Sequence, residues 1–326
     1  MELKHQVLQI LEENRGNSVN GARLAESLFV TRSSVWKAVK ALQKDGYRIT
    51  AATNRGYCLL PHNDILSAES IRPYLQGKAA GFILDVRQCV TSTNTIAKAL
   101  AAEGARDGTV IIAGEQTEGK GRMGRSFYSP GSTGIYLSLI LRPQLNLENS
   151  LLITTGTAVA VAKAIEKTAG VKAGIKWVND IFVEGRKVCG ILTEASINFE
   201  NGGLEYAVVG IGVNVSTSNF PDSIQGIAGS LFTHKPEDQP VTSLLTAEIL
   251  NQMAECMDSL ADRKYLAEYR KRQIILGKHI LVLKGNESRP AKALDIDDQA
   301  RLIVEYEDQT IETLSSGEVS IRPLKG

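Results

Sequence analysis

The stretch AGIKWVNDIFVEGRKVCGILTEASI, residues 173–197, places apolar runs on both sides of Glu184-Gly185-Arg186. Apolar, β-branched residues around a short glycine-containing turn predict a β-hairpin, so these runs lie side by side and antiparallel. In a Rossmann fold, by contrast, a helix separates successive parallel strands. The stretch therefore predicts a mixed, largely antiparallel sheet.

Further elements flank this hairpin. Strands are expected at 82–90, 108–116, 134–143 and 205–216, and helices at 63–75, 91–104, 147–169 and 243–273. Residues 274–326 contain short apolar runs with turns at Lys284-Gly285-Asn286, Asp297-Asp298 and Ser316-Gly317. That pattern predicts a small β-barrel of the SH3-like kind, or a sandwich. The expected fold class is α+β, with domains at 1–62, 63–273 and 274–326.

Positive charge gathers at the N-terminus. Residues 1–62 hold nine Lys/Arg and five Asp/Glu, a net +4, while the remainder holds 28 basic and 31 acidic residues, a net −3. Three helical patterns, with Asn20 and Thr31 as caps, precede a hairpin that turns at Asn54-Arg55-Gly56. This order is typical of a winged helix-turn-helix that binds DNA. A small helical domain with a solvated basic face is the alternative. The expected DNA contacts are Arg32, Ser33, Ser34, Lys37 and Arg55.

Several classes of protein are disfavoured. The sequence has no apolar run long enough to span a membrane, and its charged N-terminus does not suit a signal peptide. The four cysteines lie far apart and are expected to be buried, reduced thiols. The four histidines are scattered, so neither a zinc site nor a histidine-dependent triad is indicated. We expect a cytoplasmic protein without a membrane partner.

The segment GKGRMGRSFYSP, residues 119–130, follows a predicted strand and combines glycines, cations and an aromatic ring. Gly119, Gly121 and Gly124 allow backbone N–H groups to face an anion. Arg122 and Arg125 suit phosphate oxygens, and Phe127 suits a base. Taken alone, the segment indicates either a nucleotide site or an ordinary solvated turn, and it is not a Walker A loop.

Three further motifs concern a ligand. Lys176, in KWVND at 176–180, is expected within a strand, where it either faces a pocket or pairs with Asp180. Glycines inside the strand GIGVN, 210–214, indicate a bulge or the close approach of a ligand. The STN at 92–94 offers hydroxyl and amide groups that either bind a polar head or merely cap a helix.

These motifs together resemble a known family. STN, GEQTEGKGRMGRSF (114–127), KWVND, GRKVCGILTE (185–194) and GIGVN occur in the order found in biotin protein ligases. With the winged helix in front and the β-domain behind, the whole chain is similar to the bifunctional ligases that also repress biotin synthesis genes. Lys120 and Val178 depart from the arginine and proline usual in the family. Lysine lacks the bidentate fork of arginine, so Lys120 can change how tightly the loop locks.

The resemblance implies an ATP-dependent ligase that forms biotinyl-5′-AMP and transfers biotin to a lysine of a biotin carboxyl carrier domain, as in acetyl-CoA carboxylase. It implies biotin, ATP and Mg²⁺ as ligands. The residues that bind Mg²⁺ are not assigned, although Asp180 is one candidate. The implied catalytic residues are Lys176, Arg122 and Arg125. The implied biotin contacts are Ser92, Thr93, Asn94, Gln116, Gly119, Lys120, Lys176, Gly190 and Gly210. The implied nucleotide contacts are Arg122, Arg125, Phe127, Asn179 and Asn214.

The implied partners are a carboxylase acceptor domain, operator DNA and a second copy of the chain in a ligand-promoted homodimer. Two alternatives stay open at this point. A ligand-sensing repressor without catalysis would keep the pocket and the winged helix. A lipoate ligase would share the general fold. Pyrophosphate release with biotin or with lipoate distinguishes them.

Overall fold

The computed structural model describes residues 2–52, 55–143, 150–197, 203–284, 287–315 and 318–321. The chain forms two compact units, one of Met1–Gln76 with His234–Glu248 and one of Gly77–Thr233 with Ile249–Gly326. The three expected domain limits stay predictions. The expected turns at Asn54, at Gly285-Asn286 and at Ser316-Gly317, and the start of the expected helix at 147–149, lie outside the described residues.

The first unit contains the helix-turn-helix pattern and its hairpin. Asn20 accepts a hydrogen bond from the Ala22 amide at 2.8 Å, and Thr31 accepts one from the Ser34 amide at 3.2 Å, so both predicted caps are confirmed. The apolar faces of the helices meet in one core. The elements are α1 (Leu3–Glu13), α2 (Gly21–Ser27), α3 (Arg32–Lys44), β1 (Ile49–Ala52) and β2 (Gly56–Leu59), with β1 antiparallel to β2.

The link between α2 and α3 holds an unusual residue. Phe29 adopts a left-handed backbone conformation, with φ 53°, and its side chain is 96% exposed. That conformation costs a residue with a Cβ roughly 1–2 kcal/mol, and an exposed ring gains no hydrophobic free energy from burial to offset this cost.

We therefore expect Phe29→Asn to raise the free energy of unfolding by about 1 kcal/mol, because asparagine tolerates the left-handed region. Phe29→Ala is the matched control, since it removes the ring but keeps the strained conformation. Urea unfolding of all three proteins measures the difference. Equal stability of the asparagine and alanine variants would contradict the assignment of strain.

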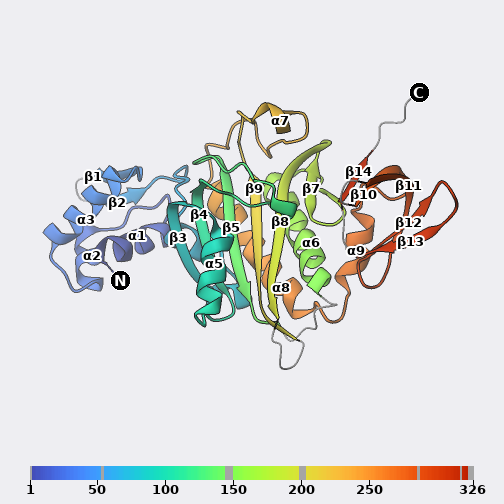
Figure 1. Ribbon diagram of the computed structural model, residues 1–326. Coiled ribbons are helices and arrows are strands. Elements are labelled where there is room, and N and C mark those ends of the chain that lie inside the picture. Colours follow the sequence, from blue (N-terminus) through green and yellow to red (C-terminus); the bar gives the residue numbers. More distant parts are fainter. Residues whose placement is uncertain are drawn as a thin grey trace. The chain divides into compact units, whose positions relative to one another are not determined.

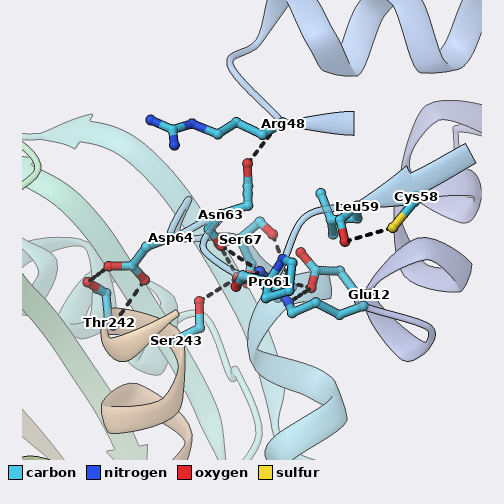
Figure 2. Close-up of polar contacts among 12 residues, drawn as sticks. Glu12, Arg48, Cys58, Leu59, Pro61, Asn63, Asp64, Ser67, Thr242 and Ser243 are labelled. Atoms are coloured by element: carbon cyan, nitrogen blue, oxygen red, sulfur yellow. Dashed lines mark hydrogen bonds and ion pairs between the residues drawn. The ribbon is translucent and has the colours of Figure 1, made fainter. Parts of the chain in front are cut away.

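Polar contacts hold the segment that follows the β1–β2 hairpin, at Asn63 and Asp64 (Figure 2). Asn63 Oδ1 accepts from the Arg48 amide at 2.7 Å, while the Asn63 carbonyl accepts from Arg15 at 2.7 Å. Asp64 accepts from the amide and the hydroxyl of Thr242, at 3.0 and 2.6 Å. Asp64 thus caps the start of a helix 178 residues further along the chain.

These contacts correct the helix expected at 63–75. Only α4 (Ala68–Ile71) and the 3₁₀ turn η1 (Arg72–Tyr74) are helical. Ser67 and Ser70 form a capping box that begins the helix late. Residues 63–66 are not helical, and Asn63 and Asp64 among them use their side chains to contact other segments of the unit.

The second unit is built on a seven-stranded sheet of order β3-β4-β5-β9-β8-β7-β6 (Figure 1). In this sheet only β3 and β4 are parallel, since the helix α5 (Thr93–Ala102) connects them; the other pairs are antiparallel. The predicted mixed, largely antiparallel sheet is confirmed. The strands are β3 (Ile83–Val90), β4 (Thr109–Gln116), β5 (Gly134–Leu141), β6 (Gly174–Lys176), β7 (Asp180–Val183), β8 (Arg186–Ile197) and β9 (Leu204–Asn214).

Helices cover both faces of this sheet. On one face, Ala97 and Ala101 of α5 pack on Ile111, Ile140 and Val208 of three neighbouring strands. On the other, Thr154 of α6 bonds to Thr193 of β8 at 2.8 Å. The helical elements of the rest of the chain are η2 (Gly77–Gly81), α5 (Thr93–Ala102), η3 (Arg122–Gly124), α6 (Ser150–Ala169), α7 (Asp222–Gln225), α8 (Val241–Asp258) and α9 (Tyr265–Lys271).

The helix expected over 243–273 is two helices, α8 and α9. Arg263, between them, has φ 56°, a left-handed conformation that a right-handed helix cannot contain. The sequence offers no glycine or proline there to signal the break.

The last part of the chain is a five-stranded antiparallel sheet of order β13-β12-β11-β10-β14, which confirms a small C-terminal β-domain. The turn at Asp297-Asp298 is confirmed, since Asp297 accepts from the amides of Gln299 and Arg301. The strands are β10 (His279–Lys284), β11 (Glu287–Ile296), β12 (Leu302–Tyr306), β13 (Ile311–Leu314) and β14 (Glu318–Ile321).

The structure bears on two expectations from composition, one about membrane-spanning helices and one about the cysteines. Among the described residues, no helix has the length and hydropathy needed to cross a membrane. All four cysteines are free thiols, as expected, but only Cys189 is buried. Cys89 is exposed because it lies on β3, an edge strand of the sheet.

Candidate ligand site

The alternation of side chains along the strands determines which residues form the site. Successive strand residues face opposite sides, so Gly210, Gly212 and Asn214 of β9 share one face while Ile211 and Val213 face the other. The same face carries Ser138 and Tyr136 of β5 and Leu192 and Gly190 of β8, as the register requires. This is the face on which α5 packs.

A cavity of about 280 Å³ opens over this face. It gathers segments that lie far apart in the sequence: the start of α5, the glycine-rich loop, KWVND and GIGVN. All predicted ligand residues except Gly119 line the cavity. They are Ser92, Thr93, Asn94, Gln116, Lys120, Arg122, Arg125, Phe127, Lys176, Asn179, Gly190, Gly210 and Asn214.

One end of the cavity is a network of hydroxyl and amide groups. Gln116 Oε1 accepts from the Thr93 amide at 2.9 Å, and Gln116 Nε2 donates to Ser129 Oγ at 2.9 Å. Ser138 Oγ lies 2.8 Å from Thr93 Oγ1 and 2.6 Å from Asn94 Oδ1. Ser92 caps α5 through the Thr95 amide. The STN motif therefore caps the helix and lines the cavity at once.

The middle of the cavity is apolar, and glycines form its floor. The ring of Phe127 lies over β8 and β9: a methyl group at Gly190 would lie 3.2 Å from it, and one at Gly212 only 2.5 Å. Phe127 also meets Tyr136 edge to face, with ring centroids 6.4 Å apart. In this structure Phe127 fills the space that Gly190 leaves, and Asn94 fills the space at Gly210.

The glycine-rich loop is a closed turn. The Phe127 amide donates to the Gly119 carbonyl at 2.8 Å, and the Gly121 amide donates to the Arg125 carbonyl at 2.7 Å. Gly119 of the loop is buried, and any side chain there would meet the Phe127 carbonyl and Ser129. The loop thereby presents Lys120, Arg122 and Arg125 as its side chains along the cavity.

KWVND is not a continuous strand, which corrects the sequence prediction. Lys176 ends β6, residues 177–179 form a turn, and Asp180 begins β7 directly opposite Lys176. Three contacts pin the turn: Trp177 Nε1 to the Ala300 carbonyl at 3.2 Å, Tyr269 Oη to the Val178 carbonyl at 3.0 Å, and Asn179 Nδ2 to the Ile191 carbonyl at 2.6 Å. Lys176 therefore projects from a rigid turn, half-buried at the cavity wall.

The cavity lining is strongly cationic. It contains five Lys/Arg side chains, those of Lys120, Arg122, Arg125, Lys176 and Lys187, and a single carboxylate, Asp180. Asp180 forms an ion pair with Lys187 at 2.7 Å, so the remaining positive charge favours an anionic ligand. Arg122 also donates to Asn179 Oδ1 at 3.1 Å, which joins two of the predicted nucleotide residues.

The Asn214 side chain offers one more polar atom to a ligand in the cavity. Asn214 Nδ2 donates to the Gly229 carbonyl at 3.0 Å, but its buried Oδ1 has no hydrogen-bond partner within the described part of the chain. That oxygen can accept from a ligand. The described residues contain no group of three or more His, Cys, Asp or Glu suited to a metal ion.

Sequence reasoning missed several residues of the cavity wall. Lys187 belongs to the quoted GRKVCGILTE run, so its cationic side chain was a usable signal. Four apolar side chains come from α7 and its flanking residues and from the β-domain, where no local pattern marks them: Phe220, Ile224, Ile227 and Val319.

The expected DNA contacts lie on the surface of the first unit. Arg32, Ser33, Lys37 and Arg55 are exposed, and Ser34 is half-buried. The hydroxyls of Ser33 and Ser34 both lie 2.9 Å from Thr31 Oγ1. Sequence reasoning missed Trp36, which is 52% exposed on α3 with Lys40 lying 5.9 Å from its ring. Its spacing of three or four residues from Arg32, Ser33 and Lys40 places it on the same face.

Known proteins resemble each part of the chain. Residues 86–214 match the biotin/lipoate A/B protein ligase family, residues 4–58 an HTH domain, and residues 275–322 the biotin protein ligase C-terminal domain. The bifunctional ligase/repressor BirA of Bacillus spizizenii is 31% identical and aligns over 94% of this chain and 95% of its own. The biotin–acetyl-CoA-carboxylase ligase of Mycobacterium tuberculosis is 32% identical over 78% of this chain and 95% of its own.

A solved structure shares the fold. It is the biotin protein ligase of Aquifex aeolicus in complex with biotin and ATP, with a TM-score of 0.62 at 24% identity, covering 74% of this chain and 98% of that one. The chain therefore belongs to the biotin protein ligase family, in the bifunctional ligase/repressor form with an N-terminal helix-turn-helix domain.

Proposed function

We propose that this chain activates biotin with ATP, releases pyrophosphate, and transfers biotin from biotinyl-5′-AMP to a lysine of a carboxylase carrier domain. The observation that carries the proposal is one cavity with three successive environments. A hydroxyl and amide end suits a urea-type head, an apolar glycine floor suits a hydrocarbon chain, and five cations suit a carboxylate and phosphates.

The chemistry needs no nucleophile from the protein. A biotin carboxylate oxygen attacks the α-phosphorus of ATP, and the bond to the β-phosphate breaks to release pyrophosphate. A neutral lysine amine of the acceptor then attacks the acyl carbon, AMP leaves, and the amine loses a proton. Lys176, Arg122 and Arg125 would bring two anions together and stabilise the charge that develops on the phosphate.

The remaining residues would position the ligands. Ser92, Thr93, Asn94 and Gln116 would bind the biotin head, with Lys120 over it, Gly119 closing the loop beneath, and Gly190 and Gly210 leaving room. Phe127 would meet the adenine side, and Asn179 and Asn214 would bind the nucleotide. Mg²⁺ would enter with the phosphates of ATP, since Mg²⁺ commonly keeps several waters and few protein ligands. We assign no protein ligand to it, because Asp180 is engaged by Lys187.

A lipoate ligase is the competing enzyme. A dithiolane ring has no N–H donor, whereas the polar end of the cavity presents Thr93, Asn94 and Gln116. The test is pyrophosphate release with Mg²⁺-ATP and either biotin or lipoate, repeated with an acceptor domain present. Release with biotin and labelling of the acceptor lysine support the proposal. Release with lipoate alone would contradict it, and ligand binding without any release would identify a pure sensor.

The first unit would bind operator DNA of biotin synthesis genes through α3 and the wing, using Arg32, Ser33, Ser34, Lys37 and Arg55. A single recognition helix reads few base pairs, so two copies of the chain on adjacent half-sites would bind much more tightly. We propose that biotinyl-5′-AMP promotes this homodimer and that an unmodified acceptor domain relieves repression by consuming the adenylate. Binding to DNA, a cytosolic acceptor and four free thiols all fit a cytoplasmic site of action.

We expect biotin plus ATP to tighten operator binding by roughly 5- to 150-fold, the range of a coupling of about 1–3 kcal/mol. A gel-shift titration on the biotin-operon promoter measures it, with Arg32→Ala as the DNA-contact variant and Arg106→Ala, an exposed site in the second unit, as its control. Identical retardation with and without ligands would contradict the switch. Normal binding by Arg32→Ala would contradict the assignment of α3.

A further inference from the structure

The helix α3 of the first unit carries an aromatic side chain on its surface. The residues of α3 that are buried in the core of that unit are Val35, Ala38, Val39 and Leu42. Trp36 is not among them, and 52% of its surface is exposed. A single exposed apolar side chain is ordinary on a protein, so the exposure alone assigns no role. The neighbours of Trp36 on the helix decide what its ring can meet.

Those neighbours are mostly cations. Arg32 and Ser33 precede the tryptophan by four and three residues, and Lys40 follows it by four, so all three share its side of the helix. Lys40 Nζ lies 5.9 Å from the centroid of the tryptophan ring. The helix contains no acidic residue and four basic ones, which are Arg32, Lys37, Lys40 and Lys44. A polyanion is therefore the partner whose charge fits this side of α3.

The ring and the cations suit different parts of a DNA duplex. Lysine and arginine side chains bind phosphates and guanine, whereas an indole ring carries no charge and a single N–H donor. The major groove, which receives the N-terminal part of a recognition helix, presents one apolar group, the 5-methyl group of thymine. Trp36 is the fifth residue of α3 and lies in its second turn. Its large ring is therefore placed to reach a base edge.

We propose that Trp36 contacts DNA and packs its ring against the 5-methyl group of one thymine in each operator half-site. This inference rests on the proposed repressor function and adds a specificity-determining residue to it. The cations of α3 hold the helix on any duplex, because phosphates are the same in every sequence. The ring instead favours a half-site that has thymine at one position. Part of the sequence discrimination thus comes from an uncharged side chain.

The first test is a gel-shift titration on the biotin-operon promoter at several salt concentrations. Trp36→Ala should bind about tenfold more weakly than the parent protein with an unchanged salt slope, because an uncharged contact releases no counterions. Lys37→Ala should instead lower the slope by about one for each bound copy. Ile311→Ala is the matched control, since Ile311 is an apolar side chain 64% exposed in the second unit. A Trp36→Ala variant that binds as tightly as Ile311→Ala overturns the proposal.

The second test replaces each thymine of a half-site in turn by uracil, which lacks only the methyl group. One replacement should weaken binding by the parent protein about fourfold, the contribution of one buried methyl group. The same replacement should have no effect on Trp36→Ala, and Trp36→Phe should stay sensitive to it because phenylalanine keeps an apolar ring. If no uracil replacement weakens the parent protein, the proposal is wrong, and this result needs no variant to fold.

Fluorescence reports the contact directly, because the chain has only two tryptophans. Trp177 is 4% exposed, so dissolved acrylamide quenches Trp36 far more readily. With biotin and Mg²⁺-ATP present, promoter DNA should shield Trp36 from acrylamide, and Trp36→Ala, which retains Trp177, should show no change. Shielding that grows with protein concentration before DNA is added would place a second copy of the chain on the ring and overturn the proposal.

The failure of this inference and that of the repressor function are distinguishable. A parent protein that retards no operator DNA contradicts the proposed repressor, and this inference with it. Retardation by the parent protein that depends neither on Trp36 nor on a thymine methyl group overturns only the role of Trp36.

Discussion

Lys176→Ala should slow pyrophosphate release by about 10²–10³-fold at saturating biotin and ATP, because the variant removes a charge that acts on the transition state. Lys176 projects from a turn whose neighbours, Trp177, Val178 and Asn179, are each held by a separate hydrogen bond. None of those bonds uses the lysine side chain, so the turn should survive the change. The loss should therefore appear in the chemical step.

Lys172→Ala is the control, since Lys172 is exposed four residues before Lys176 and does not line the cavity. Single-turnover release of pyrophosphate separates the chemical step from product release. Thermal unfolding of both variants shows whether the fold is retained. Turnover of Lys176→Ala within a few-fold of the parent protein would contradict the role proposed for this lysine.

Gly210→Ala should lower kcat/KM for biotin by about 10²-fold and leave the KM for ATP nearly unchanged. Gly210 lies on β9 between Ser138 and Leu192, and a methyl group there would collide with Asn94 Oδ1. Asn94 cannot move aside without breaking its bonds to Glu194 and Ser138. Displacing polar groups that orient a substrate by about 1 Å can cost 10²-fold in rate.

Gly81→Ala provides the comparison, because a methyl group at Gly81 would meet no atom within 4 Å. Isothermal titration with biotin and with ATP, followed by steady-state kinetics, separates the two ligands. If Gly210→Ala binds biotin as tightly as the parent, the Asn94 end of the cavity does not hold the biotin head. If both ligands bind weakly, the variant has disturbed the sheet as a whole.

Much of the fold could be predicted from local signals. Apolar runs around a glycine-containing turn predicted an antiparallel hairpin in 173–197, and Asn20 and Thr31 marked helix starts, because turn formation and capping act within a few residues. The same holds for the glycine-rich loop, whose composition identified three cations that line the cavity. Where a residue acts through its own neighbours in the chain, the sequence was sufficient.

The tertiary structure decided the contacts that join distant segments. Asp64 caps a helix at Thr242, and Glu194 accepts a hydrogen bond from Asn94; in both cases strand register or chain path, not composition, brings the groups together. KWVND forms a turn rather than a strand because groups from other segments, among them Tyr269 and Ala300, take up its polar atoms. The sequence thus determined the strands, the caps and the charged loop. Only the folded chain determined which polar groups meet, because a hydrogen bond requires atoms within about 3 Å whatever their separation along the sequence.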